Sequence, residues 1–342
     1  MERADLVLEG GGVKGIGLVG AISTLREAGY EFPRVAGTSA GAVAGCLVAA
    51  GIEVDELERL MRELDYRKFR DETLLSRFGV LGKGANLLLR KGIYKGDWLH
   101  DWVSAQLAAA GRRTWGDLRI TPEEDPRSAL RPEQAYKLVV IVSDVSDNRL
   151  LRLPWDYHLI GTPQDQVDEL PVADAVRASA SIPFFFQPCK LQVAGRNGPV
   201  YLTDGGMLSN FPIDVFDRRD GQDPRWPTFG VKLSARPDAN LRADPPHIDG
   251  PLELAMALVG TMSTAHDQMH LDDPAVVDRT MFVDSLGVKA TDFDIDEDTQ
   301  DRLYEQGRKA GTKFLDRWKF TDYLQKHRRA ATGDQAGAAI PA

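Results

Sequence analysis

Cysteine is scarce in this sequence, and its scarcity argues against two classes of site. The 342 residues include two cysteines, Cys46 and Cys189, and these do not form a C-x-x-C pair. A zinc site or a dithiol redox motif is therefore not expected. We interpret both cysteines as small hydrophobic side chains of the core.

Long apolar segments are missing as well. The chain opens with the charged segment MERAD, and the apolar run from Leu6 to Leu8 is far too short for the hydrophobic region of a signal peptide. No segment approaches the roughly 20 apolar residues that a membrane-spanning helix requires. The sequence predicts a cytoplasmic protein and leaves peripheral contact with a membrane surface open.

Positive charge is in deficit. Lysine and arginine number 42 against 51 aspartate and glutamate residues, which gives a net charge of -9. Nucleic-acid binding requires a basic face, so we expect no nucleic-acid partner. Hydrophobic residues make up 43% of the chain, enough for a sizeable core in one large α/β domain or in two smaller ones.

Short apolar segments alternate with helical patterns along the chain. We expect strands at residues 6–9, 34–37, 136–143, 200–203 and 229–233. Helices are expected at residues 15–28, 41–50, 54–69, 97–110, 172–180, 252–270 and 297–326. The order strand, helix, strand, helix at the start of the chain indicates an α/β fold with a parallel-type central sheet and helices packed on it.

The first chemical signal is the G-x-S-x-G motif at residues 37–41. Ser39 follows an expected strand and opens an expected helix, which is the context of a nucleophile elbow. Gly37 and Gly41 allow the strand and the helix to approach each other, and the helix N-terminus directs partial positive charge at the reacting centre. The motif alone is weak, because it also fits a plain glycine-rich turn.

The second signal is a glycine-rich loop between a strand and a helix. Acyl transfer builds an oxyanion, and backbone N–H groups must converge on it without obstruction by side chains. The candidate donors are Gly10, Gly11, Gly12, Val13, Lys14, Gly15 and the residue after the serine, Ala40. The same loop satisfies the G-x-G-x-x-G fingerprint of dinucleotide-binding proteins, with Glu27 or Glu31 near the position of the ribose-binding acid.

The third signal is Asp204-Gly205-Gly206, directly after an expected strand. A carboxylate at a strand end can reach a neighbouring loop, although an Asp-Gly-Gly segment also suits an ordinary β-turn. In this order, the glycine-rich loop, the G-x-S-x-G motif and the D-G-G motif resemble the patatin-like phospholipase family. Segments at residues 178–183 (ASASIP), 92–97 (GIYKGD) and 114–118 (TWGDL) extend the resemblance.

The resemblance implies a patatin-like three-layer α/β/α catalytic domain over about residues 5–218. Residues 219–327 are expected to complete the same globule, and residues 330–342 are expected to form a disordered tail. The resemblance also implies a Ser–Asp dyad, with Ser39 as nucleophile and Asp204 as base. The expected substrates are phospholipids or other lipid esters, and no cofactor or metal is required.

Histidine offers an alternative base. An α/β-hydrolase places its histidine after the acid, so His247, His266 and His270 are formal candidates for a Ser–His–Asp triad. His266 and His270 also have the spacing of a metal pair, but Asp267 stands where zinc proteases have glutamate. We interpret these histidines as ordinary surface or core residues.

Residues 76–95 form the candidate membrane-contact segment. The segment has five basic residues and no acidic one: Arg77, Lys83, Arg90, Lys91 and Lys95. Apolar residues lie between them: Phe78, Val80, Leu81, Leu87, Leu88, Leu89, Ile93 and Tyr94. Mixed basic and apolar residues suit a segment that lies on anionic lipid, although an ordinary loop and helix would also account for them. Residues 184–186, three phenylalanines, are candidates for the wall of an acyl path.

Two other functions remain open from the sequence. One is a nucleotide-binding protein that uses the loop at residues 10–15, and the other is a catalytically silent or ligand-gated relative. The sequence determines neither the oligomeric state nor the lipid head group, the ester position or the acyl length. The family it resembles includes housekeeping lipases, bacterial effectors and phospholipases of antiviral defence, and the sequence does not choose among them.

Overall fold

The computed structural model describes residues 1–69, 91–127, 130–193, 195–234, 250, 254, 257–262 and 271–329. Its strands are β1 (Glu2–Arg3), β2 (Asp5–Leu8), β3 (Tyr30–Glu31), β4 (Val35–Thr38), β5 (Gly92–Tyr94), β6 (Leu138–Asp144), β7 (Arg149–Leu153), β8 (Phe184–Phe186), β9 (Cys189–Leu191), β10 (Val200–Asp204), β11 (Thr228–Lys232) and β12 (Thr280–Phe282). Its α-helices are α1 (Gly15–Glu27), α2 (Ala40–Ala49), α3 (Val54–Arg62), α5 (Asp97–Ala109), α6 (Val172–Ser179), α8 (Pro274–Asp278), α9 (Glu297–Leu315) and α10 (Phe320–Leu324).

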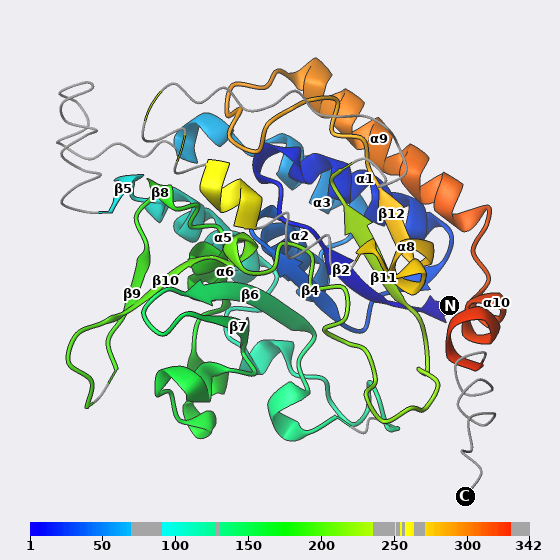
Figure 1. The fold of residues 1–342 in the computed structure, drawn as a ribbon, viewed down its shortest axis with the longest axis horizontal. Coiled ribbons are helices and arrows are strands. Elements are labelled where there is room, and N and C mark those ends of the chain that lie inside the picture. The colour runs from blue at the N-terminus through cyan, green and yellow to red at the C-terminus, as the bar shows by residue number, and fades with distance from the viewer. Residues whose placement is uncertain are drawn as a thin grey trace, which may run out of the picture.

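An eight-stranded sheet forms the centre of the molecule (Figure 1). Its order is β12-β11-β2-β4-β6-β10-β9, and β7 also pairs with β6. Strands β12, β11, β2, β4 and β6 are parallel, whereas β7, β10 and β9 pair antiparallel with their neighbours. The expected α/β fold with a mainly parallel sheet and flanking helices is therefore confirmed.

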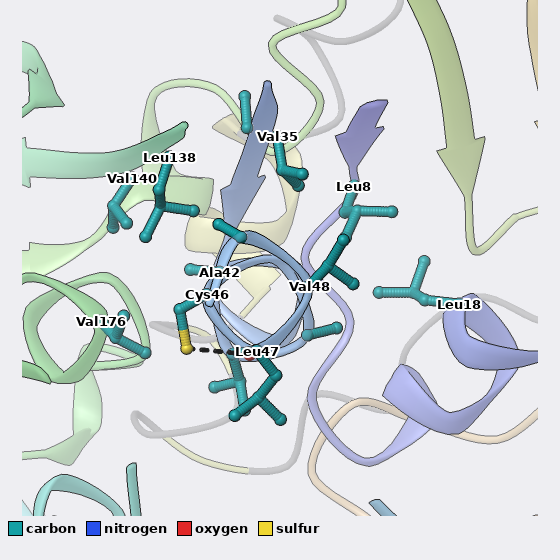
Figure 2. Packing of buried hydrophobic residues seen from close by; sticks show 14 of the residues in the cluster. Leu8, Leu18, Val35, Ala42, Cys46, Leu47, Val48, Leu138, Val140 and Val176 are labelled. Atoms are coloured by element: carbon teal, nitrogen blue, oxygen red, sulfur yellow. Dashed lines mark hydrogen bonds between the residues drawn. The ribbon is translucent and has the colours of Figure 1, made fainter. Parts of the chain in front are cut away.

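Helix α2 occupies the middle of the core, and Ser39 directly precedes its first residue. It packs on β2, β4 and β6 and lies between α1 and α6. Figure 2 shows it surrounded by Leu8, Val35, Leu138 and Val140 of the strands, with Leu18 of α1 and Val176 of α6 on its flanks. Small residues along α2 permit this close packing, and Cys46 is buried on it as expected.

Two helices are shorter than the sequence pattern predicts. The helix expected at residues 54–69 ends at Arg62, and Tyr66–Phe69 forms a separate 3-10 turn that brings Phe69 against Trp98 and Phe293. The helix expected at residues 297–326 ends at Leu315, and α10 begins at Phe320. In both cases the chain turns where an aromatic side chain finds partners distant in sequence.

Other expectations lie outside the described residues. These are most of the helix at residues 252–270, the tail at residues 330–342, and residues 76–90 of the candidate membrane-contact segment. In the part of the chain that is described, no helix combines the length and the apolar character needed to cross a bilayer. Strands β11 and β12, from the C-terminal third of the chain, extend the same sheet beside β2.

Candidate active site

Two strands meet end to end beside β6, and their last residues bring Ser39 and Asp204 together. Strand β4 pairs with the first half of β6 and ends at Thr38, opposite Ile141. Strand β10 runs the other way and ends at Asp204, opposite Val142, the next residue of β6. Strand β7 occupies the other edge of β6, so β4 and β10 share one edge and their carboxyl ends point at each other. The sheet changes from parallel to antiparallel at this point.

Ser39 lies on a strained turn between β4 and α2. Its φ of 53° and ψ of -121° fall in a region that L-residues rarely adopt, and 6% of the residue is exposed. A Cβ on Gly37 would lie 2.2 Å from the carbonyl oxygen of Gly41, and one on Gly41 would lie 2.3 Å from the carbonyl oxygen of Leu8. Only glycine fits at either position, so the motif permits the tight packing that holds the turn.

Asp204 is buried, with 6% of the residue exposed, and burial raises the pKa of its carboxyl to about 6. The amide of Gly206 donates to Asp204 Oδ1 at 2.8 Å, which opposes that rise by favouring the carboxylate. The Ser39 side chain makes a smaller contribution in the same direction. The carboxyl is therefore next to the Ser39 hydroxyl and ionised at neutral pH. Gly205 is required here too, since a Cβ would lie 2.3 Å from the carbonyl oxygen of Ile141.

The glycine-rich loop divides its amides into two groups. Four donate to backbone carbonyls: those of Gly10, Val13, Lys14 and Gly15. Three have no acceptor within the described residues: those of Gly11, Gly12 and Ala40. Gly12 has a φ of +55°, and a Cβ there would lie 1.9 Å from the carbonyl oxygen of Ala290, so the loop conformation requires glycine.

Lys14 anchors this loop rather than pointing into solvent. Its Nζ donates to the carbonyl oxygen of Leu233 at 3.3 Å. Burial lowers the pKa of Lys14, and the nearby Glu9 carboxylate opposes that shift. Glu9 itself pairs with Lys232 and accepts from the Leu233 amide. The loop is thus tied to the end of β11.

Two polar residues that contact the site were not predicted from the sequence. Ser179, the last residue of α6, accepts a hydrogen bond from the Ser39 amide at 2.9 Å, and its own hydroxyl donates to the carbonyl oxygen of Ile141 at 2.6 Å. Asn210 accepts from the Gly10 amide through its backbone oxygen and donates from Nδ2 to the Gly10 carbonyl oxygen. Ser179 lies within the segment ASASIP, so a signal was present, but its partner lies 140 residues away.

An apolar pocket opens beside Ser39. Its lining consists of Gly12, Ser39, Ala40, Val43, Met61, Leu64, Phe69, Leu99, Ala180, Ile182, Phe186 and Phe293. Its volume of about 30 Å³ holds one or two water molecules. Of the three phenylalanines proposed for an acyl path, Phe186 lines this pocket, and Phe185 stacks on Phe293 with ring centroids 4.9 Å apart.

The histidines that the structure describes are engaged elsewhere. His100 contacts Asp101 and Asp174, His158 contacts the Trp155 carbonyl oxygen, and His327 contacts Asp278. The three candidates for a triad, His247, His266 and His270, lie outside the described residues. Within the described ranges, no group of three or more His, Cys, Asp or Glu side chains is arranged to hold a metal ion.

The acids required by the dinucleotide interpretation are not placed to bind a ribose at the loop. Glu27 ends α1 and forms a bidentate ion pair with Arg308, at 2.7 and 2.9 Å. Glu31 lies in β3, before β4 begins, whereas a ribose-binding acid belongs at the carboxyl end of the second strand. Thr38 and Ser39 occupy that position here.

Comparison with known proteins identifies relatives over most of the chain. Residues 6–217 match the family model described as patatin-like phospholipase. YqhO of Bacillus subtilis is 35% identical over 320 residues, which cover 92% of this chain and 99% of YqhO. R571 of Acanthamoeba polyphaga mimivirus is 25% identical over 217 residues, which cover 62% of this chain and 61% of R571.

Among solved structures, VipD from Legionella pneumophila has a similar fold. The TM-score is 0.53 at 20% sequence identity, and the match covers 92% of this chain and 67% of the VipD chain. An identity this low supports a shared fold and no finer statement.

Proposed function

Because the chain belongs to the patatin-like phospholipase family, we propose that it is a serine acyl hydrolase that cleaves carboxylic esters of phospholipids or other lipids. The observation that carries the proposal is the meeting of Ser39 and Asp204 at the ends of β4 and β10. A strained serine beside a buried carboxylate, with nearby amides that have no acceptor within the described residues, is suited to acyl transfer.

In this mechanism Asp204 acts as the general base. Its pKa of about 6 makes it ionised at neutral pH and a better proton acceptor than an exposed aspartate. The Ser39 oxygen attacks the ester carbonyl while its proton passes to Asp204, and the same proton then goes to the departing alkoxide. The acyl group remains on Ser39 until a water molecule, deprotonated by Asp204, releases it as a carboxylic acid.

We assign the oxyanion-binding role to the amides of Gly11, Gly12 and Ala40. Gly12 and Ala40 line the same pocket as Ser39, and none of the three amides has an acceptor within the described part of the chain. The remaining amides of the loop hold its conformation through backbone carbonyls. Ala40 also begins α2, so its N–H lies at the positive end of the helix.

The pocket beside Ser39 is proposed to receive the acyl chain. Its walls are apolar and include the large side chains of Met61, Phe186 and Phe293. At about 30 Å³ the space is smaller than a long acyl chain, so binding such a chain requires these side chains to move. Methionine is suited to this role because its unbranched side chain changes conformation easily.

Activity assays on single variants test the dyad. Ser39→Ala and Asp204→Asn should each lose at least 99% of the hydrolysis of p-nitrophenyl butyrate, and Ser39→Ala should also lose labelling by a fluorophosphonate probe. Ser104→Ala and Asp156→Asn, a helix serine and a buried aspartate paired with Arg152, are matched controls that should remain active. A folded Ser39→Ala enzyme with substantial activity would refute the nucleophile assignment.

Two further variants address the alternative base, and EDTA treatment of the wild type addresses metal dependence. His266→Ala and His270→Ala should keep most of the activity, as should the wild-type enzyme in EDTA. If a histidine variant is inactive and folded while Asp204→Asn works, the triad interpretation is correct. A loss in EDTA that added calcium or zinc restores would contradict the metal-free dyad.

Contact with anionic lipid through residues 76–95 remains part of the proposal. Within this segment the structure describes Lys91, which lies over the Tyr201 ring, and Lys95, which is 3.8 Å from Asp97. Replacing Arg90, Lys91 and Lys95 by glutamate should weaken sedimentation with phosphatidylglycerol vesicles while hydrolysis of a soluble ester is unchanged. The control variant replaces three exposed basic residues of α9, Arg302, Lys309 and Lys313, by glutamate. Equal sedimentation of the wild type and the first variant at low salt would refute the contact.

A further inference from the structure

A second and larger cavity lies at the amino ends of the parallel strands, opposite the ends that lead to Ser39. Its volume is about 1020 Å³, large enough for a small organic ligand. Its walls include residues at the starts of the parallel strands, among them Asp5 of β2, Arg34 before β4 and Thr228 of β11. Ser39 follows the other end of β4, so the two sites are separated by four strand residues, about 13 Å.

This distal cavity is basic in an acidic protein. Eleven lysine and arginine side chains and six carboxylates line it, whereas the whole chain has a net charge of -9. Five of the basic residues pair with carboxylates of the same walls, for example Arg225 with Asp125 and Arg279 with Asp217. Four have no salt bridge within the described residues: Arg3, Arg26, Arg127 and Arg328.

These four arginines come from distant parts of the chain. Arg3 belongs to β1 and Arg328 follows α10, and Figure 1 places the N-terminus beside α10. Arg26 lies near the end of α1, and Arg127 belongs to the loop before β6. Their convergence on one cavity is a property of the tertiary structure. Arg26 is near Glu31 and Arg3 is near Asp125, but the basic side chains of the walls outnumber the carboxylates by five, and such an excess favours the binding of an anion.

Aromatic side chains complete the walls. The half-buried Trp226 ring lies 5.8 Å from the Arg3 guanidinium and 4.5 Å from that of Arg225. The indole N–H of Trp155 is buried without an acceptor within the described residues. Arginines and indoles together bind flat rings as well as anionic groups.

We propose that this distal cavity binds a soluble organic polyphosphate, a small molecule with two or more phosphate groups and a flat ring. Guanidinium groups bind phosphate through paired hydrogen bonds, and several arginines on one cavity favour a multiply charged ligand. The C-terminal end of α2 also borders the cavity, and its partial negative charge opposes anion binding. The excess of arginine side chains on its walls must therefore supply the attraction.

A soluble ligand is favoured over a lipid head group, an argument that depends on the proposed hydrolase function. An enzyme that takes acyl chains from a bilayer must turn the ends of the strands that carry Ser39 toward the lipid. The distal cavity opens at the opposite ends of the strands, so it faces away from the membrane. Phosphate on a membrane lipid would have no access to it in that orientation.

Titration calorimetry on the full chain at low ionic strength tests the proposal. The probes are phosphate, pyrophosphate, tripolyphosphate and ATP without metal. Saturable binding of one tripolyphosphate per chain is expected, about tenfold tighter than phosphate, because more guanidinium groups engage the longer anion. ATP should bind at least as tightly as tripolyphosphate, because its base contacts the aromatic wall.

The double variant Arg3→Gln and Arg127→Gln removes two exposed cations of the cavity that have no salt bridge within the described residues. It should weaken ATP binding about tenfold. The matched control, Arg59→Gln with Arg302→Gln, makes the same change in net charge at exposed positions of α3 and α9 and should change the affinity less than about twofold.

Three results would overturn the proposal. One is the absence of saturable tripolyphosphate or ATP binding, and another is equal weakening by the two double variants, which would indicate a general charge effect. The third is binding to phosphatidylglycerol vesicles that depends on Arg3 and Arg127, with no binding of the soluble probes. Calorimetry measures binding and not turnover, so each result is independent of whether Ser39 hydrolyses esters.

Discussion

The burial of Asp204 makes the stability of this protein depend on pH in a direction opposite to that of a typical paired aspartate. Burial raises the pKa of the carboxyl from 3.8 to about 6 in the folded state. Between these two values the folded state holds a proton that the unfolded state has released, so stability falls as pH rises. Each unit of pKa shift corresponds to about 1.4 kcal/mol, so ionised Asp204 destabilises the fold by about 3 kcal/mol at pH 8.

Asp204→Asn removes this cost while keeping an oxygen that can accept from the Gly206 amide. The difference in unfolding free energy between variant and wild type should shift in favour of the variant by about 2 kcal/mol between pH 4.5 and pH 8. Urea unfolding followed by circular dichroism at both pH values measures it. With a urea m-value of about 3 kcal/mol/M, the difference between the two unfolding midpoints should change by roughly 0.7 M.

Asp125→Asn is the matched control. Asp125 is buried and its carboxylate receives two hydrogen bonds from Arg225, at 2.9 and 2.7 Å, which lower its pKa. Its pairing stabilises the fold above pH 3.8 and is lost only as pH falls through the lowered pKa. This variant should be destabilised by a similar amount at pH 4.5 and at pH 8. If the difference in unfolding free energy between Asp204→Asn and the wild type is also the same at pH 4.5 and at pH 8, Asp204 does not have a raised pKa and the reasoning fails.

The same carboxyl should govern the rate: kcat/KM for a soluble ester should fall about tenfold per pH unit below pH 6, and a profile that is flat from pH 5 to 8 would contradict Asp204 as the base. Ser179→Ala should lower kcat by 10- to 100-fold with little change in KM, because the Ser39 amide loses its acceptor, a hydrogen bond of roughly 1–3 kcal/mol. The control Ser181→Ala should lower kcat less. Equal losses of kcat in the two variants would show that the contact with the Ser39 amide has no special role. Met61→Ala should move the preference among p-nitrophenyl esters toward longer acyl chains, whereas Leu60→Ala, its buried neighbour outside the pocket, should leave the preference unchanged. Identical chain-length profiles for Met61→Ala and wild type would remove this pocket from the acyl path.

The local strands, turns and helices could be predicted from the sequence because each depends on neighbouring residues. Glycines at 37 and 41 mark a strand that turns sharply into a helix, and the apolar run at 138–142 is typical of a buried strand. The ends of the helices at residues 62 and 315 were not predictable in this way. They depend on Phe69 and Trp318, which pack on aromatic rings far away in the chain.

The sequence by itself determined the residue types of the site: a serine between glycines, a carboxylate before two glycines, and a loop of glycines. Only the tertiary structure decided how they meet, since the registers of β4 and β10 on β6 place Thr38 and Asp204 opposite consecutive residues. It also decided the contact of Ser179 with the Ser39 amide and the gathering of Met61 and Phe293 in one pocket. Spacing along the chain specifies local conformation, whereas contacts between distant residues arise from sheet register and side-chain packing.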